Sequence, residues 1–148
     1  MATLSDLARQ MEQLEVSLPE LMAKAKADAG RVMVNYLIEE TPVDTSQALS
    51  NWKVAWGQPD RNTIGPYVPG KFGSTYSDSV QEAQLQAALI LSSPVENKDL
   101  FISNNVDYIE ELNDETSKSK QSGFFVERAE ALVGQFIDNY SLKLPASL

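Results

Sequence analysis

The residues best suited to chemistry in this chain are acidic side chains gathered in one short segment. That segment holds Asp107, Glu110, Glu111, Asp114 and Glu115. Paired carboxylates can bind a divalent metal or serve as general acid and base. The segment lacks the glycine and the glutamate spacing of a calcium-binding loop, so a solvated face or a subunit contact explains it better. We therefore predict no catalytic residue and no metal ligand, with a small carboxylate- and metal-dependent enzyme as the alternative.

A second candidate for chemistry is the run from Gly65 to Lys71, which has the glycine and lysine spacing of a phosphate-binding loop. Phe72 follows the lysine where that motif needs Ser or Thr, and two prolines interrupt the run. The chain also has no cysteine and no histidine, which excludes disulfides, thiolate zinc sites and histidine-based catalysis. We therefore predict no cofactor and no enzymatic activity.

The charge of the chain is strongly acidic, with 12 Lys and Arg against 21 Asp and Glu and a net charge of −9. Such a chain repels polyanions at long range, so a role in coating DNA or RNA is disfavoured. An acidic adaptor protein is a further alternative. No apolar run approaches the length of about 20 residues that spans a bilayer, and no signal peptide is visible. We expect a protein that stays in a cytoplasm or in an assembly made there, without membrane contact.

Helical patterns dominate both ends of the chain. Thr3 and Asp6 have the spacing of a capping box, and a second such pair, Ser17 with Glu20, surrounds Pro19. The pattern predicts two helices, or one helix kinked at Pro19, reaching Glu40. Apolar residues recur at helical intervals along this region, and we interpret them as a stripe that faces the core. Another strongly periodic helix is predicted over residues 124–142.

Between these ends the sequence predicts short elements separated by turns. Strands are expected over residues 52–56 and 100–102, and a helix capped by Ser77 is expected over residues 77–92. Residues 107–115 fit a short helix or an extended edge. Residues 58–76 are rich in glycine, proline and aromatics, a composition that favours a loop ordered against a neighbour.

The predicted fold class is α+β, with a small antiparallel sheet flanked by long N-terminal and C-terminal helices. We expect a single domain over residues 1–148, with a helical extension at 1–16 and an inserted loop and helix at 58–93. The part of the inserted helix from Leu85 to Leu91 is apolar most of the way round and needs cover on two sides. The aromatic residues assigned to the core are Trp52, Trp56, Phe101, Phe125 and Phe136.

Two stretches of the chain carry a recognisable arrangement of turn and packing residues. The first consists of Thr41, Pro42, Val43, Asp44 and Thr45, followed by Trp52. The second consists of Tyr108, Leu112, Thr116, Ser117, Lys118 and Gly123. In order and spacing they resemble the phage tail-completion and neck (head–tail connector) family of the HK97 type. Ser46 stands where that family often has glycine, so we expect less demand for a left-handed backbone there.

The resemblance implies a structural subunit of a virion, made in the host cytoplasm and forming a ring at the head-proximal end of the tail or in the neck. A hexameric ring, contacts with other neck and tail-tube proteins, and a channel that passes genomic DNA without binding it are the family-like expectations. The predicted subunit interface uses the loop at 58–76, the strand edges and the polar loop at 116–123, with two residues of the acidic segment. Its candidate residues are Arg61, Tyr67, Lys71, Phe72, Tyr76, Glu110, Glu111, Lys118 and Lys120.

Overall fold

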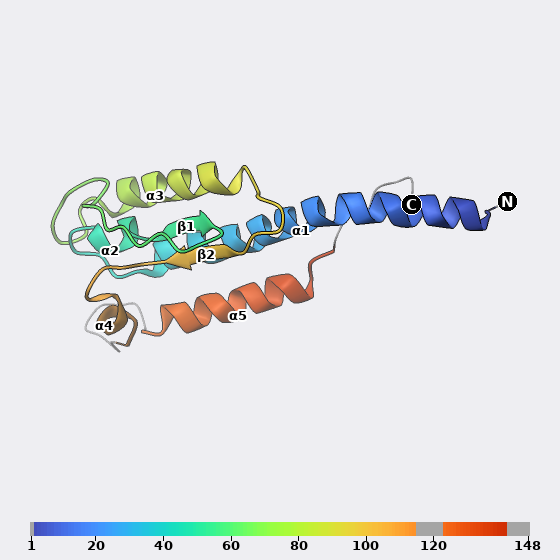
Figure 1. Cartoon of the computed structure of the whole chain (residues 1–148). Coiled ribbons are helices and arrows are strands. Elements are labelled where there is room, and N and C mark those ends of the chain that lie inside the picture. The colour runs from blue at the N-terminus through green and yellow to red at the C-terminus, as the bar shows by residue number, and fades with distance from the viewer. Residues whose placement is uncertain (1, 115–122, 142–148) are drawn as a thin grey trace.

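The computed structural model describes residues 2–114 and 123–141, which form five helices and two strands (Figure 1). The predicted α+β class is confirmed, with a long first helix, a two-stranded antiparallel sheet and a C-terminal helix. In chain order the elements are α1 (Leu4–Glu40), α2 (Gln47–Ser50), β1 (Lys53–Trp56), α3 (Tyr76–Leu91), β2 (Leu100–Ser103), α4 (Ile109–Asp114) and α5 (Phe125–Asp138).

The first helix, α1, is continuous over 37 residues and is therefore about 55 Å long. The capping box predicted at its start is present, because the side chain of Thr3 accepts from the amide of Asp6 and the carboxylate of Asp6 accepts from Thr3. The second start predicted at Ser17 does not form, and Pro19 lies inside the helix. The residues that follow Pro19 are Glu, Leu, Met, Ala and Lys, which are strong helix formers and carry the helix past the lost hydrogen bond.

The two strands pair in antiparallel register, with Val54 opposite Ile102 and Trp56 opposite Leu100. These four side chains lie on one face of the sheet and pack against the core. Phe101 lies on the other face by the two-residue period and is only partly buried, so its assignment to the core is wrong.

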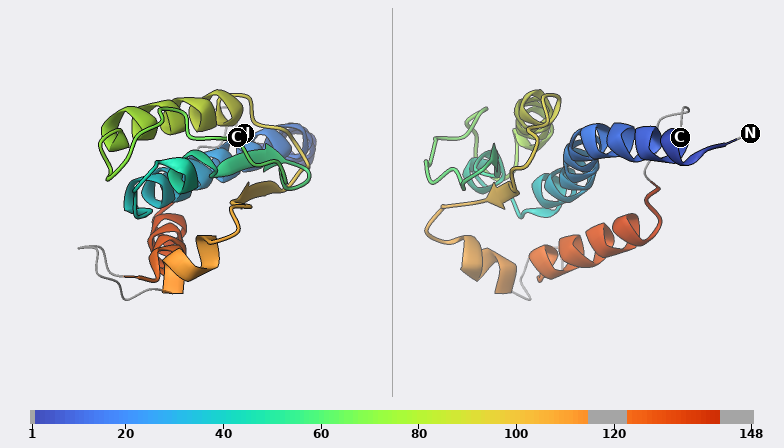
Figure 2. Two further views of the ribbon diagram at one scale, coloured as in Figure 1. Left: turned by 90° about the vertical axis from the view of Figure 1, so that its left-hand side faces the viewer. Right: turned by 45° about the vertical axis from the view of Figure 1, so that its right-hand side comes forward.

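The core lies where α3, α5 and the sheet meet the C-terminal half of α1 (Figure 2). Trp52 and Phe125 meet there edge to face, with ring centroids 6.4 Å apart. Phe136 is partly exposed and contacts Tyr140 instead, because this end of α5 packs mainly on α1; its predicted place in the core is wrong. The largest buried apolar side chains are Phe125, Leu37, Ile38, Leu49, Leu91 and Val34.

Three local predictions are corrected by the structure, and one choice between two alternatives is decided. The helix α3 begins at Tyr76 after Thr75, so Ser77 lies within its first turn and is not its cap. The helix α5 ends at Asp138, short of the predicted residue 142. Ser46 adopts a left-handed conformation with φ of 68°, because its buried hydroxyl bonds to Thr75 and its carbonyl accepts from Ser50. The segment before residue 115 is helical rather than an extended edge.

Candidate interaction surfaces

The first family-like motif forms a closed corner between α1 and β1. Thr41 ends α1 in an extended conformation, as expected for a residue before Pro42. Its buried hydroxyl donates to the carbonyl of Leu37 at 2.5 Å and accepts from the indole nitrogen of Trp52 at 2.8 Å. Val43 packs against the core. Thr41, Val43 and Trp52 therefore serve to position α1 and β1 relative to each other.

Asp44 holds the tip of the loop that precedes α3. Its carboxylate accepts from the amide of Phe72 at 2.6 Å, and its carbonyl accepts from the amide of Gly73 at 2.9 Å. Phe72 is 92% exposed and adopts a left-handed φ of 57°, which is costly for a residue with a Cβ. The loop therefore presents a large apolar side chain to solvent in a conformation that Asp44 stabilises.

The rest of the loop at 58–76 is held by hydrogen bonds within its own chain. From its composition, we expected a loop that becomes ordered against a neighbour. The side chain of Asn51 exchanges two hydrogen bonds with the backbone of Ile64, at 2.8 and 2.7 Å. The hydroxyl of Ser50 accepts from the amide of Tyr67 at 3.0 Å. Sequence reasoning overlooked Asn51 and Ser50, because a polar residue at the end of a four-residue helix carries no signal for a partner 13 to 17 residues away.

The remaining residues of the predicted interface are divided between surface and interior. Arg61, Lys71, Glu110 and Glu111 are exposed. Tyr67 and Tyr76 pack against the core of the same chain, and the hydroxyl of Tyr76 donates to the carbonyl of Glu39 at 2.7 Å. Burial raises the pKa of both tyrosines, with a further rise from Glu82 at Tyr67 and from Glu39 and Glu40 at Tyr76. Lys118 and Lys120 lie outside the described residues.

The second family-like motif lies close to the first. Tyr108 directly precedes α4, and burial, followed by the nearby negative charge of Asp44, raises its pKa. Leu112 packs against the core, and Gly123 is buried just before α5. Asn113 joins α4 to α5, because its side chain accepts from the amide of Val126 at 2.9 Å. The motif residues Thr116, Ser117 and Lys118 lie outside the described residues.

At the opposite end of α1, its N-terminal half extends beyond the other described elements (Figure 1). We call residues 4–22 the arm. Leu4, Leu7 and Met11 on the arm are 85%, 51% and 61% exposed, and Val16, Leu18 and Met22 are exposed as well. The prediction of a continuous core-facing stripe is therefore wrong over the arm, because α3 and α5 do not reach it. Periodicity alone cannot tell a helix face buried in its own chain from one left open.

The outer face of α3 is a second open apolar surface. Ala83, Ala87 and Leu91 are buried against the body, while Leu85, Leu89 and Ile90 are exposed. We expected α3 to be covered on two sides, and the described residues cover it on one side.

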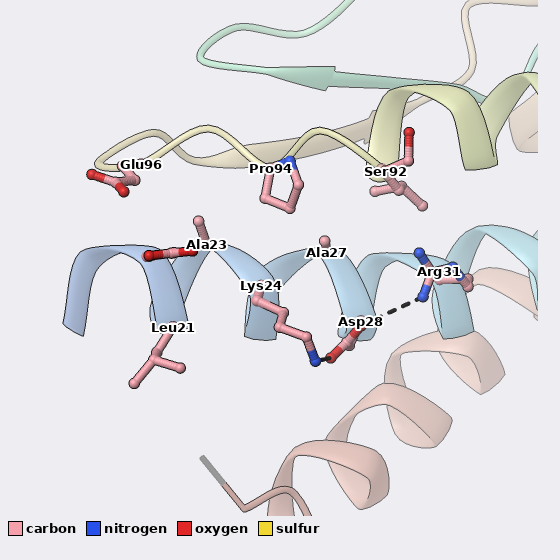
Figure 3. Close-up of a pocket in the computed structure, with 11 residues that line it drawn as sticks. Leu21, Ala23, Lys24, Ala27, Asp28, Arg31, Ser92, Pro94 and Glu96 are labelled. Atoms are coloured by element: carbon pink, nitrogen blue, oxygen red, sulfur yellow. Dashed lines mark hydrogen bonds and ion pairs between the residues drawn. The ribbon is translucent and has the colours of Figure 1, made fainter. Parts of the chain in front are cut away.

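A groove of about 650 Å³ separates the middle of α1 from the chain that follows α3 (Figure 3). Asp28 lies along it between Lys24 and Arg31, with ion-pair distances of 3.5 and 3.4 Å. Ala23, Ala27 and Pro94 form its apolar walls. Glu20 and Glu96 also line the groove, so acidic side chains outnumber basic ones along it.

The described residues contain no group of three or more acidic side chains placed to share a metal ion. Glu115, the last member of the acidic segment, lies outside that part of the chain. Among the helices of the described ranges, none combines the length and hydropathy needed to cross a bilayer. No protein-family model, curated protein or solved structure matches this chain.

Proposed function

We propose that this protein is a structural, non-enzymatic subunit of a phage virion, forming a ring at the head-proximal end of the tail or in the neck. The proposal draws on the resemblance of the two motifs and on surfaces suited to contacts with other proteins. Neighbouring subunits and other neck and tail-tube proteins are its partners.

The observation that carries the proposal is the presence of exposed apolar side chains at both ends of one long helix. The arm lies at the N-terminal end of α1, and Phe72 is held by Asp44 just beyond its C-terminal end. Large exposed apolar groups mark sites of protein contact. A subunit with such groups near the two ends of a helix about 55 Å long can contact a different neighbour at each end, as a component joining two parts of a virion must.

The charge of the chain fits a ring around DNA. With a net charge of −9, the subunit repels the phosphate backbone and would let the genome pass through a central channel without binding it. Crosslinks between DNA and an arginine or lysine facing the channel would contradict this part of the proposal.

The test is addition of the purified full-length protein to phage tails that lack it. We expect the protein to bind at one end of the tail as a ring in electron micrographs, and to restore joining of heads to tails. The substitution Phe72→Ala should reduce binding at least about tenfold while leaving the unfolding midpoint unchanged, because the side chain is 92% exposed. Val95→Ala, also at an exposed residue, is the matched control and should bind normally. Failure of the unmodified protein to bind tails would overturn the proposal.

A further inference from the structure

We propose that the arm pairs with the arm of a second copy of this chain, through a seam of six apolar residues. Numbered from Leu4, the seam follows alternating steps of three and four residues over two and a half heptads. Its members are Leu4, Leu7, Met11, Leu14, Leu18 and Leu21. This is the spacing at which two helices interdigitate their side chains in a coiled coil. The continuity of α1 through Pro19 keeps all six side chains on one face.

The same face of α1 is covered by a helix farther along. If the heptad is continued past Leu21, Asp28 and Val32 lie on the same face of α1. The hydroxyl of Tyr140 donates to Asp28 at 2.7 Å, and Phe136 lies beside Val32. The helix α5 ends at Asp138, so it covers this face of α1 only farther along the helix, and the seam extends beyond it. Exposure accordingly rises toward the N-terminus, where Leu4 is 85% exposed while Leu14 and Leu21 are half-buried.

The charges of the arm lie away from the seam. Asp6, Arg9, Glu12 and Glu20 occupy the outer heptad positions, and Glu15 alone flanks the seam. Two parallel copies would set Glu15 opposite Gln10, so no like charges face each other. Pairing therefore buries apolar side chains without desolvating charge, although the arm carries four acids and one base.

The length of the seam selects a second arm as its occupant. The seam extends about 26 Å, whereas the exposed apolar stripe of α3 from Leu85 to Ile90 extends only about 8 Å. Only another copy of the arm offers an apolar helix face of equal length among the described residues. Because the arm continues a helix anchored in the folded body, pairing does not need to nucleate it.

The orientation of the pair rests on the proposed function, whereas pairing itself does not. In a ring whose arms all point the same way, arms that meet run parallel, and each seam-to-seam pair has its own two-fold axis, so the arms associate two by two within the ring. In a parallel pair the two copies of residue 11 face each other across the seam.

Sedimentation velocity of the full chain, from about 5 to 500 μM, tests the pairing. We expect the mass to rise above the 16.3 kDa of one chain as concentration increases. Met11→Glu should weaken association at least about tenfold, because it places a charge in the seam of both copies. Val16→Glu is the matched control, since Val16 is 78% exposed on the outer face of the same arm and should leave association unchanged.

Three outcomes would overturn the pairing. The first is a monomer at every concentration, as would be expected if residues 142–148 of the same chain occupied the seam. The second is an equal effect of Met11→Glu and Val16→Glu on association. The third is dissociation by Leu89→Glu and not by Met11→Glu, which would assign the contact to α3.

A disulfide reports the orientation, and the absence of cysteine from the chain makes a single introduced thiol unambiguous. Met11→Cys should form a crosslinked dimer under mild oxidation, and Val16→Cys should associate without forming the crosslink. Association without the disulfide at residue 11 would show an antiparallel pair and would contradict the ring while leaving arm pairing in place. Arm pairing with no binding to tails would likewise remove the proposed function alone.

Discussion

The indole nitrogen of Trp52 donates a 2.8 Å hydrogen bond to the hydroxyl of Thr41, and this bond closes the corner between α1 and β1. The two residues are the outer members of the first motif and are 11 positions apart. The same hydroxyl donates to the carbonyl of Leu37, so one buried oxygen satisfies a helix end and a tryptophan at once. The hydrogen bonds of Thr41 and Trp52 therefore make this part of the motif a packing junction.

Thr41→Val should lower the free energy of unfolding by about 1 to 3 kcal/mol, because it leaves the indole nitrogen of Trp52 without its acceptor and removes one of the two donors to the carbonyl of Leu37. Urea unfolding followed by circular dichroism measures the change. Thr41→Ser keeps the hydroxyl and should recover much of the loss. Thr45→Val, at an exposed threonine of the same motif, should change stability by less than about 0.5 kcal/mol. Equal losses at both threonines would contradict the role of the corner hydrogen bonds.

Asp44→Ala should loosen the loop tip, because the amide of Phe72 loses its carboxylate acceptor while its left-handed backbone remains unfavourable. We expect trypsin to cut after Lys71 about tenfold faster, since cleavage follows local opening. Arg61 is exposed in the same loop on the far side of the Asn51–Ile64 bonds, and its cleavage rate should not change. A parallel increase at both sites would show general unfolding instead of loosening at the tip.

The fold class was predictable because periodicity reports which residues share a face. The strand positions of Val54 and Trp56, and the short β2, followed from alternation and from flanking turn residues, whereas Trp52 lies just before β1. The assignment of Phe101 to the core failed because hydrophobicity does not reveal which face of a two-stranded sheet is covered. That choice depends on register, which pairs Ala55 with Phe101 on the outer face.

The candidate surfaces were predictable only in part. The loop around Lys71 and Phe72 was identified from its composition, but its dependence on Asp44 involves residues 28 positions apart. The arm was predicted as helix and misassigned as a core face, because its apolar spacing is the same whether the covering helix belongs to this chain or to another. Which helix covers a given face depends on the lengths of the helices and on how they pack together. Neither can be read from the local sequence.

Gly134→Ala should raise the free energy of unfolding by about 0.5 to 1 kcal/mol. Gly134 lies within α5, and a Cβ there would meet no described atom within 4 Å, so alanine gains helix propensity without a clash. Gly30→Ala in α1 is the contrasting variant, because a Cβ at Gly30 would overlap the side chain of Leu100. The gain in helix propensity should be offset by the cost of displacing Leu100. Gly30→Ala should therefore be at least about 1 kcal/mol less stable than Gly134→Ala. Thermal unfolding of both variants checks the difference.

Alkaline pH should destabilise the protein through its tyrosines, and Tyr140 offers the clearest case. Its hydrogen bond to Asp28, together with burial and the negative charge of Asp28, raises its pKa above the ordinary value of 10.0. The folded state therefore holds the phenol proton more tightly than the unfolded state does. This contribution is complete below pH 10 and is lost as pH rises through the folded pKa, because the unfolded chain ionises first.

Tyr140→Phe should cost about 0.5 to 1.5 kcal/mol at pH 8, where the hydrogen bond is intact. The difference in stability between the variant and the unmodified protein should shrink between pH 10 and 11.5, where lysine titration affects both alike. Urea titrations at pH 8, 10 and 11 measure this convergence. Tyr76→Phe, which removes a different tyrosine whose pKa is raised by burial first, should converge in the same way. A constant difference across that range would mean that Tyr140 contributes by packing beside Phe136 and not by its hydrogen bond.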